Sequence, residues 1–222
     1  MNAETSVPQA RPAASGTRRL LDAGIVAGPF YLVVGIAQGL LREGFDFGRH
    51  PLSVLANGSW GWIQSANFVL TGLMVIAAAV GIARVLGRSR TMTWSLGLYG
   101  LAMVAAAIFP ADPVDGFPPG TPEGFPTSIS TTGLLHFVSG ALAFAAVGFS
   151  GLAAAWTFWR QRMTPLALLS LFSGLSVLFG FFGGMVTVGI LGIWFAVVVG
   201  WLWLSVVSMR LKANVPEDAG GR

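Results

Sequence analysis

Residues 163–209 carry no charged side chain over 47 consecutive positions. A helix needs about 20 mainly apolar residues to cross the hydrocarbon layer of a bilayer. The stretch is therefore too long for one spanning helix and suits two, joined by a tight turn at Gly183-Gly184. It predicts spans at 165–182 and 186–209, with Pro165 in the first turn, where its missing N–H has no helical partner to lose.

Four earlier apolar runs are also long enough to cross a bilayer, at 20–41, 62–84, 92–109 and 133–158. The whole chain is 54% hydrophobic and 10% charged, whereas soluble domains carry about 25% charged residues. We therefore expect an all-α membrane protein, a bundle of six transmembrane helices. Gly28-Pro29 predicts a kink in the first span, and the carbonyl that proline leaves free needs a partner on another helix or a water molecule.

The distribution of basic residues predicts the orientation of the bundle. If the N-terminus is cytoplasmic, the outer loops hold only Arg42 and Arg49, and the other 11 of the 13 Lys and Arg residues lie on the cytoplasmic side. Cytoplasmic loops of membrane proteins are enriched in these residues. We expect a disordered cytoplasmic tail at 1–19, a membrane domain at 20–209 and a second cytoplasmic tail at 210–222.

The basic pI of about 10.7 does not indicate nucleic-acid binding, because the few basic residues lie at the ends of apolar runs rather than in a patch. The chain has no cysteine, which excludes disulfides and thiolate metal sites. No acidic residue lies in the middle of a predicted span, and this argues against a transporter driven by protons or voltage.

Several side chains of reactive types are predicted to lie on the outer side of the membrane. They belong to two predicted outer loops, 42–61 and 110–132, and to the start of the fourth span. These side chains are Arg49, His50, Ser53, Asp112, Asp115 and His136. Imidazoles and carboxylates could bind a metal ion through His50, Asp112, Asp115 and His136. Ser53 with a histidine and an aspartate (His50 or His136, with Asp112) could instead form a catalytic nucleophile, base and orienting group. Neither set has a diagnostic spacing, and the alternative is that these residues shape loops and cap helices.

Polar residues also occur in the outer halves of the first two spans. Gln64, Asn67 and Thr71 fall on one helix face, and Gln38 lies four residues before Arg42. They predict either a polar pocket open to the outside, lined by Gln38, Arg42, Gln64, Asn67 and His136, or hydrogen bonds that hold helices together.

Three segments resemble a known bacterial family. They are Gly-Phe-Asp-Phe-Gly-Arg-His-Pro-Leu-Ser at 44–53, Gly-Trp-Ile-Gln-Ser-Ala-Asn-Phe at 61–68 and Phe-Pro-Ala-Asp-Pro at 109–113. Together they are similar to the membrane proteins of domain of unknown function 998, over residues 20–209. The resemblance implies a multi-pass protein of a bacterial inner (plasma) membrane with six spans. It implies no enzymatic or binding activity, because none is established for the family.

The leading hypothesis is a protein that binds a lipid headgroup or small polar molecule in the outward pocket. Arg42 or Arg49 would contact an anionic group, and Gln64, Asn67 and His136 would form hydrogen bonds. The alternatives are a membrane hydrolase or transferase that uses His50, His136 and Asp112, with or without a metal, and a structural or assembly partner. The residues specify no cofactor and no oligomeric state.

Overall fold

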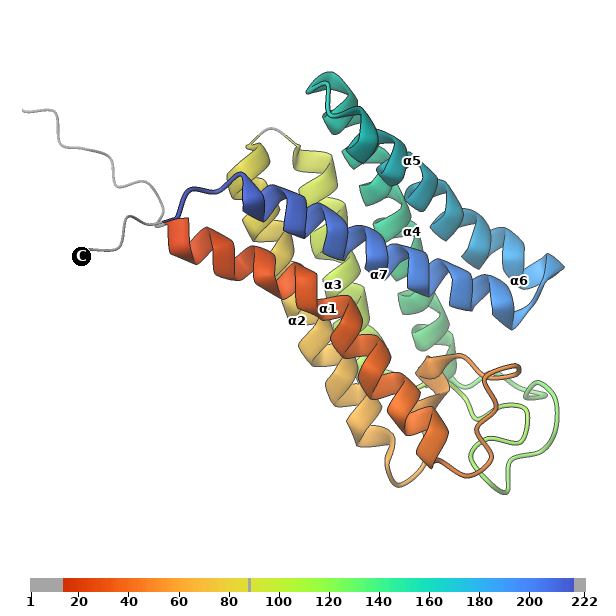
Figure 1. Cartoon of the computed structure of the whole chain (residues 1–222). Helices are drawn as coiled ribbons and strands as arrows, with labels where there is room; N and C mark the ends of the chain where they lie inside the picture. Colours follow the sequence, from red (N-terminus) through yellow and green to blue (C-terminus); the bar gives the residue numbers. More distant parts are fainter. Residues whose placement is uncertain (1–13, 88, 218–222) are drawn as a thin grey trace, which may run out of the picture.

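The computed structural model describes residues 14–87 and 89–217, and helices dominate this part of the chain (Figure 1). Six helices are long and apolar enough to cross a membrane, which confirms the predicted fold class. They are α1 (Ala14–Leu41), α2 (Gly61–Leu86), α3 (Arg90–Ile108), α4 (Thr131–Arg160), α5 (Thr164–Leu178) with its continuation η2 (Phe179–Gly183), and α7 (Ile190–Ala213). Two shorter elements are η1 (Leu52–Ala56) and α6 (Gly184–Thr187).

The spanning helices form a closed ring. Each helix from α1 to α5 packs against the next, and α7 packs against both α5 and α1. The start of α1 and the end of α7 lie side by side (Figure 1), where Lys212 donates to Asp22 over 2.5 Å and Arg18 donates to the Val215 carbonyl over 2.9 Å. Both ends of the described chain therefore lie at the same end of the bundle.

Helix α1 begins at Ala14, six residues before the predicted start of the first span. Thr17 is already buried, so residues 14–19 are part of the bundle rather than of a tail. The remaining residues of the predicted N-terminal tail, 1–13, lie outside the described residues, as do 218–222 of the C-terminal tail.

The contact between α1 and α7 depends on small residues. A Cβ atom built on Gly24 would lie 2.3 Å from Ser208 Oγ, and one built on Gly28 would lie 2.7 Å from the Cβ of Trp201. Two glycines four residues apart allow the helix backbones to approach closely, which is how helices associate in lipid. Any larger side chain at these positions would separate α1 from α7.

Pro29 interrupts the hydrogen bonding of α1, and α1 changes direction part-way along its length (Figure 1). Proline has no N–H, so the Ile25 carbonyl four residues earlier has no helical donor. The Ser205 hydroxyl of α7 donates to this carbonyl over 3.0 Å. The predicted need for a partner on a neighbouring helix is thus met by a side chain, and the kink is fixed against α7.

Replacing Ser205 with alanine should lower the free energy of unfolding by about 0.6 kcal/mol, the average for hydrogen bonds between helices in one membrane protein. In a Pro29→Ala background the new N–H can bond the Ile25 carbonyl within α1, so the same Ser205→Ala change should lower it less. Unfolding in mixed detergent micelles, measured for the four proteins of this cycle, tests the prediction. Equal losses in both backgrounds would contradict it.

The predicted turn at Gly183-Gly184 is wrong. The chain stays helical through η2 and α6 and turns at Val188-Gly189, where Gly189 has a φ of 62°. The earlier glycines serve packing instead, because a Cβ on Gly180 would lie 2.7 Å from the Gly192 carbonyl oxygen and one on Gly184 would lie 2.9 Å from its Cα. Helix α7 consequently starts at Ile190 rather than at residue 186.

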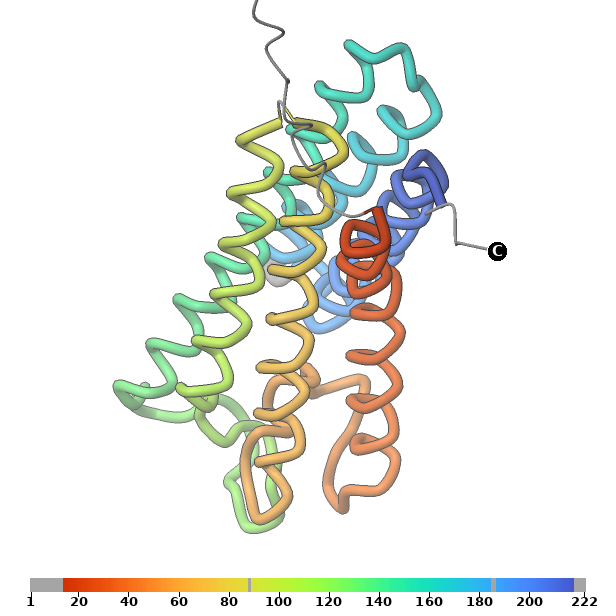
Figure 2. Tube along the Cα trace, turned by 90° about the vertical axis from the view of Figure 1, so that its left-hand side faces the viewer, coloured from red at the N-terminus to blue at the C-terminus, as the bar shows by residue number. Residues whose placement is uncertain are grey.

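The two long loops, residues 42–60 and 109–130, lie together at the opposite end of the bundle from the start of α1 (Figures 1 and 2). We call this the loop end. The turn between α6 and α7 lies part-way along the bundle and does not reach as far as the loops (Figure 2). The Trp194 indole near the start of α7 donates to the Phe47 carbonyl over 3.1 Å, so the first loop holds this end of α7.

Candidate functional site

Arg42 organises the first loop. It follows the last residue of α1, and its guanidinium donates to the Leu55 carbonyl over 2.5 Å and to the Asn57 carbonyl over 2.6 Å. The same group lies 4.8 Å from the ring centroid of Phe117 in the second loop. The Leu55 and Asn57 carbonyls lie at the end of η1, where they have no donor within a helix, and the Arg42 guanidinium supplies the missing donors. Its cation is therefore used by the loops.

His50 joins the two loops. Its ring is fully buried, between Phe45 and Phe117 at centroid distances of 5.4 Å and 5.6 Å. The Asp46 backbone N–H donates to Nδ1 over 3.0 Å, and Nε2 lies 3.0 Å from the Asp115 carbonyl. Since an N–H can only donate and a carbonyl only accept, the proton must be on Nε2. Both ring nitrogens are thus occupied by backbone groups.

The second loop turns sharply at Asp115-Gly116. Both residues have positive φ, 57° and 85°, and Val114 and Phe117 exchange backbone hydrogen bonds of 2.9 Å and 3.1 Å across the turn. Asp-Gly is a preferred pair for such a turn. The turn projects the Asp115 carboxylate towards Arg49, at 2.7 Å from Nη2 to Oδ1, and Arg49 also pairs with Glu123.

This ion pair makes one contact between the loops dependent on pH. The hydrogen bond from Arg49, and secondarily that from the Gly124 N–H, lower the pKa of Asp115 below its usual range. A lowered carboxyl pKa contributes stability that is fully present above the pKa in the unfolded chain, about 3.9. That contribution is lost as the pH falls towards the pKa of the folded protein.

We expect wild-type protein to have a higher Tm than Asp115→Asn at neutral pH, and the difference to narrow as the pH falls below about 4. Thermal unfolding of the purified protein over a pH series measures it. Glu43→Gln is the matched control, because Glu43 is an exposed carboxylate of the same loop end without an ion pair in the described residues. A difference that stays constant with pH would contradict the prediction.

Asp112 caps helix α4. Its carboxylate accepts from the Ser130 N–H over 3.0 Å and from the Ser130 hydroxyl over 2.5 Å. Ser130 is the N-cap residue, and its Oγ accepts from the Gly133 N–H over 2.9 Å. Ser130 thereby satisfies one of the free N–H donors at the start of the helix, and Asp112 holds Ser130 in place. The alternative that aspartate before proline shapes a loop and caps a helix describes Asp112 well.

His136 lies two turns into α4 and is buried. Its Nδ1 lies 2.8 Å from the Phe109 carbonyl at the end of α3, so Nδ1 carries the proton. In the neutral ring, Nε2 then has a lone pair and can accept a hydrogen bond. The ring lies against Phe68 of α2, at a centroid distance of 6.3 Å.

The polar residues of the first two spans bond to one another. Gln38 of α1 donates to the Gln64 side-chain oxygen over 2.8 Å, and Asn67 donates to the Tyr31 carbonyl over 3.1 Å. Thr71 in turn donates to Asn67 over 3.2 Å. Gln64, Asn67 and Thr71 are no more than 1% exposed. This network links α1 to α2, as the second of the two interpretations proposed, and it does not line the cavity described next.

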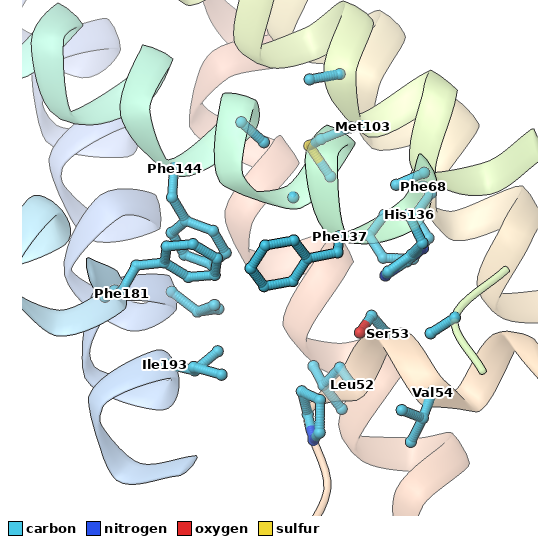
Figure 3. A pocket seen from close by; sticks show the side chains of 18 of the residues that line it. Leu52, Ser53, Val54, Phe68, Met103, His136, Phe137, Phe144, Phe181 and Ile193 are labelled. Carbon is cyan, nitrogen blue, oxygen red and sulfur yellow. The ribbon is translucent and has the colours of Figure 1, made fainter. Parts of the chain in front are cut away.

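A cavity of about 350 Å³ lies inside the ring at the loop end. Its walls come from five spanning helices and η2, and its cover comes from η1 and the second loop. They include Tyr31, Leu52, Phe68, Met103, Val114, Phe144, Phe181, Ile193 and Trp201. Phe144 and Phe181 stack at a centroid distance of 4.2 Å at one side of it (Figure 3). The volume falls in the range of small-molecule sites, roughly 300–1,000 Å³.

The rim of the cavity is apolar and exposed. Phe125 and Ile129 of the second loop and Leu134 and Phe137 of α4 all line the cavity, and each is more than half exposed. Phe137 lies between the α4 and α7 sides of the space in Figure 3. Exposed apolar side chains on a helix that is long and apolar enough to cross a membrane are suited to contact with lipid tails. The rim therefore gives the cavity an apolar opening.

The structure brings only some of the candidate residues to the cavity. Ser53, Asp112 and His136 line it, whereas Arg42, Arg49, His50, Gln64, Asn67 and Asp115 do not. No hydrogen bond joins Ser53 to His136, and within the described residues no three His, Cys, Asp or Glu side chains gather as a metal site would need. The metal and triad arrangements are therefore not assembled in this part of the chain.

Sequence reasoning missed most of the cavity, which is built from ordinary apolar residues. Gly140 is its least expected member, because a Cβ added there would meet nothing within 4 Å. A glycine inside a helix usually permits close packing, as Gly148 and Gly151 do against α5. The one sequence signal for the cavity was Gly140, a glycine in the middle of a helix, one turn after Phe137.

The comparisons with known proteins agree with the fold. A family described as "Protein of unknown function (DUF998)" matches residues 25–210. The chain belongs to this family. No curated protein and no solved structure matches it. The resemblance expected from the motifs at 44–53, 61–68 and 109–113 is therefore confirmed, and the family assigns no reaction or ligand.

Proposed function

We propose that this member of the DUF998 family is a multi-pass protein of a bacterial inner membrane that takes a lipid molecule from the bilayer into the cavity at its loop end. The observation that carries the proposal is an apolar cavity of about 350 Å³ whose rim residues are themselves exposed and apolar. A lipid chain could enter past Phe137 without crossing water. The surplus of Lys and Arg on the end that holds both termini supports a cytoplasmic position for that end.

In this proposal the affinity for lipid comes mainly from apolar walls, whereas in the polar pocket expected from the sequence it would come from polar side chains. Arg42 and Asn67 are occupied by contacts within the protein, and Gln64 is buried at the contact between α1 and α2, so none of the three lines the cavity where a headgroup would bind. Burial of a lipid chain against aromatic and aliphatic walls contributes about 25 cal/mol per Å² relative to water. Since the chain leaves lipid and not water, the net gain rests on fit and on the few polar atoms at the loop end.

Filling the cavity tests the proposal. In Gly140→Leu the new side chain extends into the cavity from a position where its Cβ meets no atom within 4 Å. We expect this protein to fold normally and to retain severalfold less lipid. Lipid per mole of protein, measured by mass spectrometry after purification and exhaustive washing, gives the result.

Gly97→Leu is the matched control. Gly97 is also a mid-helix glycine whose added Cβ meets nothing within 4 Å, but it lies on α3 away from the cavity. Both changes raise helix propensity equally. If both proteins retain the same lipid as wild type, the cavity does not hold lipid, and a structural or assembly role gains support.

A further inference from the structure

Few of the side chains that line the cavity carry polar atoms, and Ser53 and His136 are two of these. Ser53 is on η1, and its hydroxyl points into the cavity (Figure 3). Within the described residues it has no hydrogen-bond partner, unlike the hydroxyls of Ser150, Ser170 and Ser205, which bond between helices. A hydroxyl can donate one hydrogen bond and accept others. Ser53 is thus available to a bound molecule.

His136 offers a complementary group. Its Nδ1 proton is directed to the Phe109 carbonyl, so Nε2 is the atom of the ring that remains to accept a hydrogen bond. The ring lines the same cavity as Ser53 (Figure 3). Together the two side chains can present one donor and one acceptor to a cavity whose lining is mainly apolar.

Charge excludes an anionic partner at this position. No Lys or Arg among the described residues lines the cavity. The two arginines of the loop end are engaged elsewhere, Arg42 with loop carbonyls and Arg49 with Asp115 and Glu123. The one charged residue at the cavity is Asp112, whose carboxylate would repel a phosphate or carboxylate head. A buried charge without a partner is strongly unfavourable.

Resting on the function proposed above, we infer that the bound molecule is an uncharged lipid with a hydroxyl head. That hydroxyl donates to His136 Nε2 and accepts from the Ser53 hydroxyl, while the chain occupies the apolar part of the cavity towards Phe144 and Phe181. A hydroxyl both donates and accepts, so its chemistry matches both protein groups. A carbonyl head has no proton for Nε2, and a phosphate head finds no cation.

Three probes with the same chain and different heads test the inference: tritiated dodecanol, dodecane and dodecyl phosphate. Each is equilibrated with the full chain in phosphatidylcholine nanodiscs, and binding is counted above that of the Gly140→Leu protein. We expect dodecanol to bind about tenfold more tightly than dodecane, as two hydrogen bonds of ordinary strength imply. Dodecyl phosphate should bind more weakly than dodecanol.

Two substitutions test which side chains bind the hydroxyl head of the lipid. Ser53→Ala removes its hydroxyl, and His136→Asn removes Nε2 while its amide N–H can still donate to the Phe109 carbonyl and preserve the α3–α4 contact. Each should bring dodecanol towards the affinity of dodecane and leave dodecane unchanged. An unaltered melting temperature in nanodiscs separates this loss from unfolding.

The outcomes separate the two proposals. Equal binding of all three probes, each blocked by Gly140→Leu, would retain lipid binding and overturn the hydroxyl head. Tighter binding of dodecyl phosphate would also overturn it. Binding of none of the probes above the Gly140→Leu background, together with unchanged lipid content in that protein, would overturn lipid binding itself.

Discussion

The absence of water in the hydrocarbon layer is the constraint on which this structure depends. Every backbone polar group within a spanning helix must find its partner inside the protein. The Ile25 carbonyl, freed by Pro29, is bonded by Ser205, and Ser150 bonds the Met92 carbonyl of α3. Such bonds fix the helices in place at defined heights, and small residues such as Gly24 and Gly28 bring the backbones close enough to form them.

The same requirement uses up most of the polar residues that could have formed a site. Arg42 bonds carbonyls at the end of η1, His50 bonds backbone groups of both loops, and Asp112 caps α4 through Ser130. These contacts join the loops into a cover over the loop end of the bundle. A residue that holds the cover in place is not free to bind a ligand, and we therefore assign the recognition of a bound headgroup to Ser53 and His136.

The cavity arises from an uneven bundle. The turn between α6 and α7 lies part-way along the other helices, because Gly180 and Gly184 pack directly on Gly192 (Figure 2). Next to this turn, α4 faces the first half of α7 across the cavity, which residues of the second loop also line. The aromatic and aliphatic side chains of α4 at this level are exposed, so the space has an apolar rim that suits the entry of a lipid chain, as we propose.

The sequence by itself determined the number of spans, their approximate bounds, the family and the presence of a kink at Pro29. Hydrophobic length and proline chemistry are local properties, and they act before any helix meets another. Only the tertiary structure decided which polar residues were free. Gln64 and Asn67 have the pattern of a pocket face, but whether that face meets a cavity or helix α1 depends on contacts between residues about 30 positions apart. The cavity itself is a volume left between side chains from five spanning helices, η1, η2 and the second loop, and no single segment of the sequence encodes it.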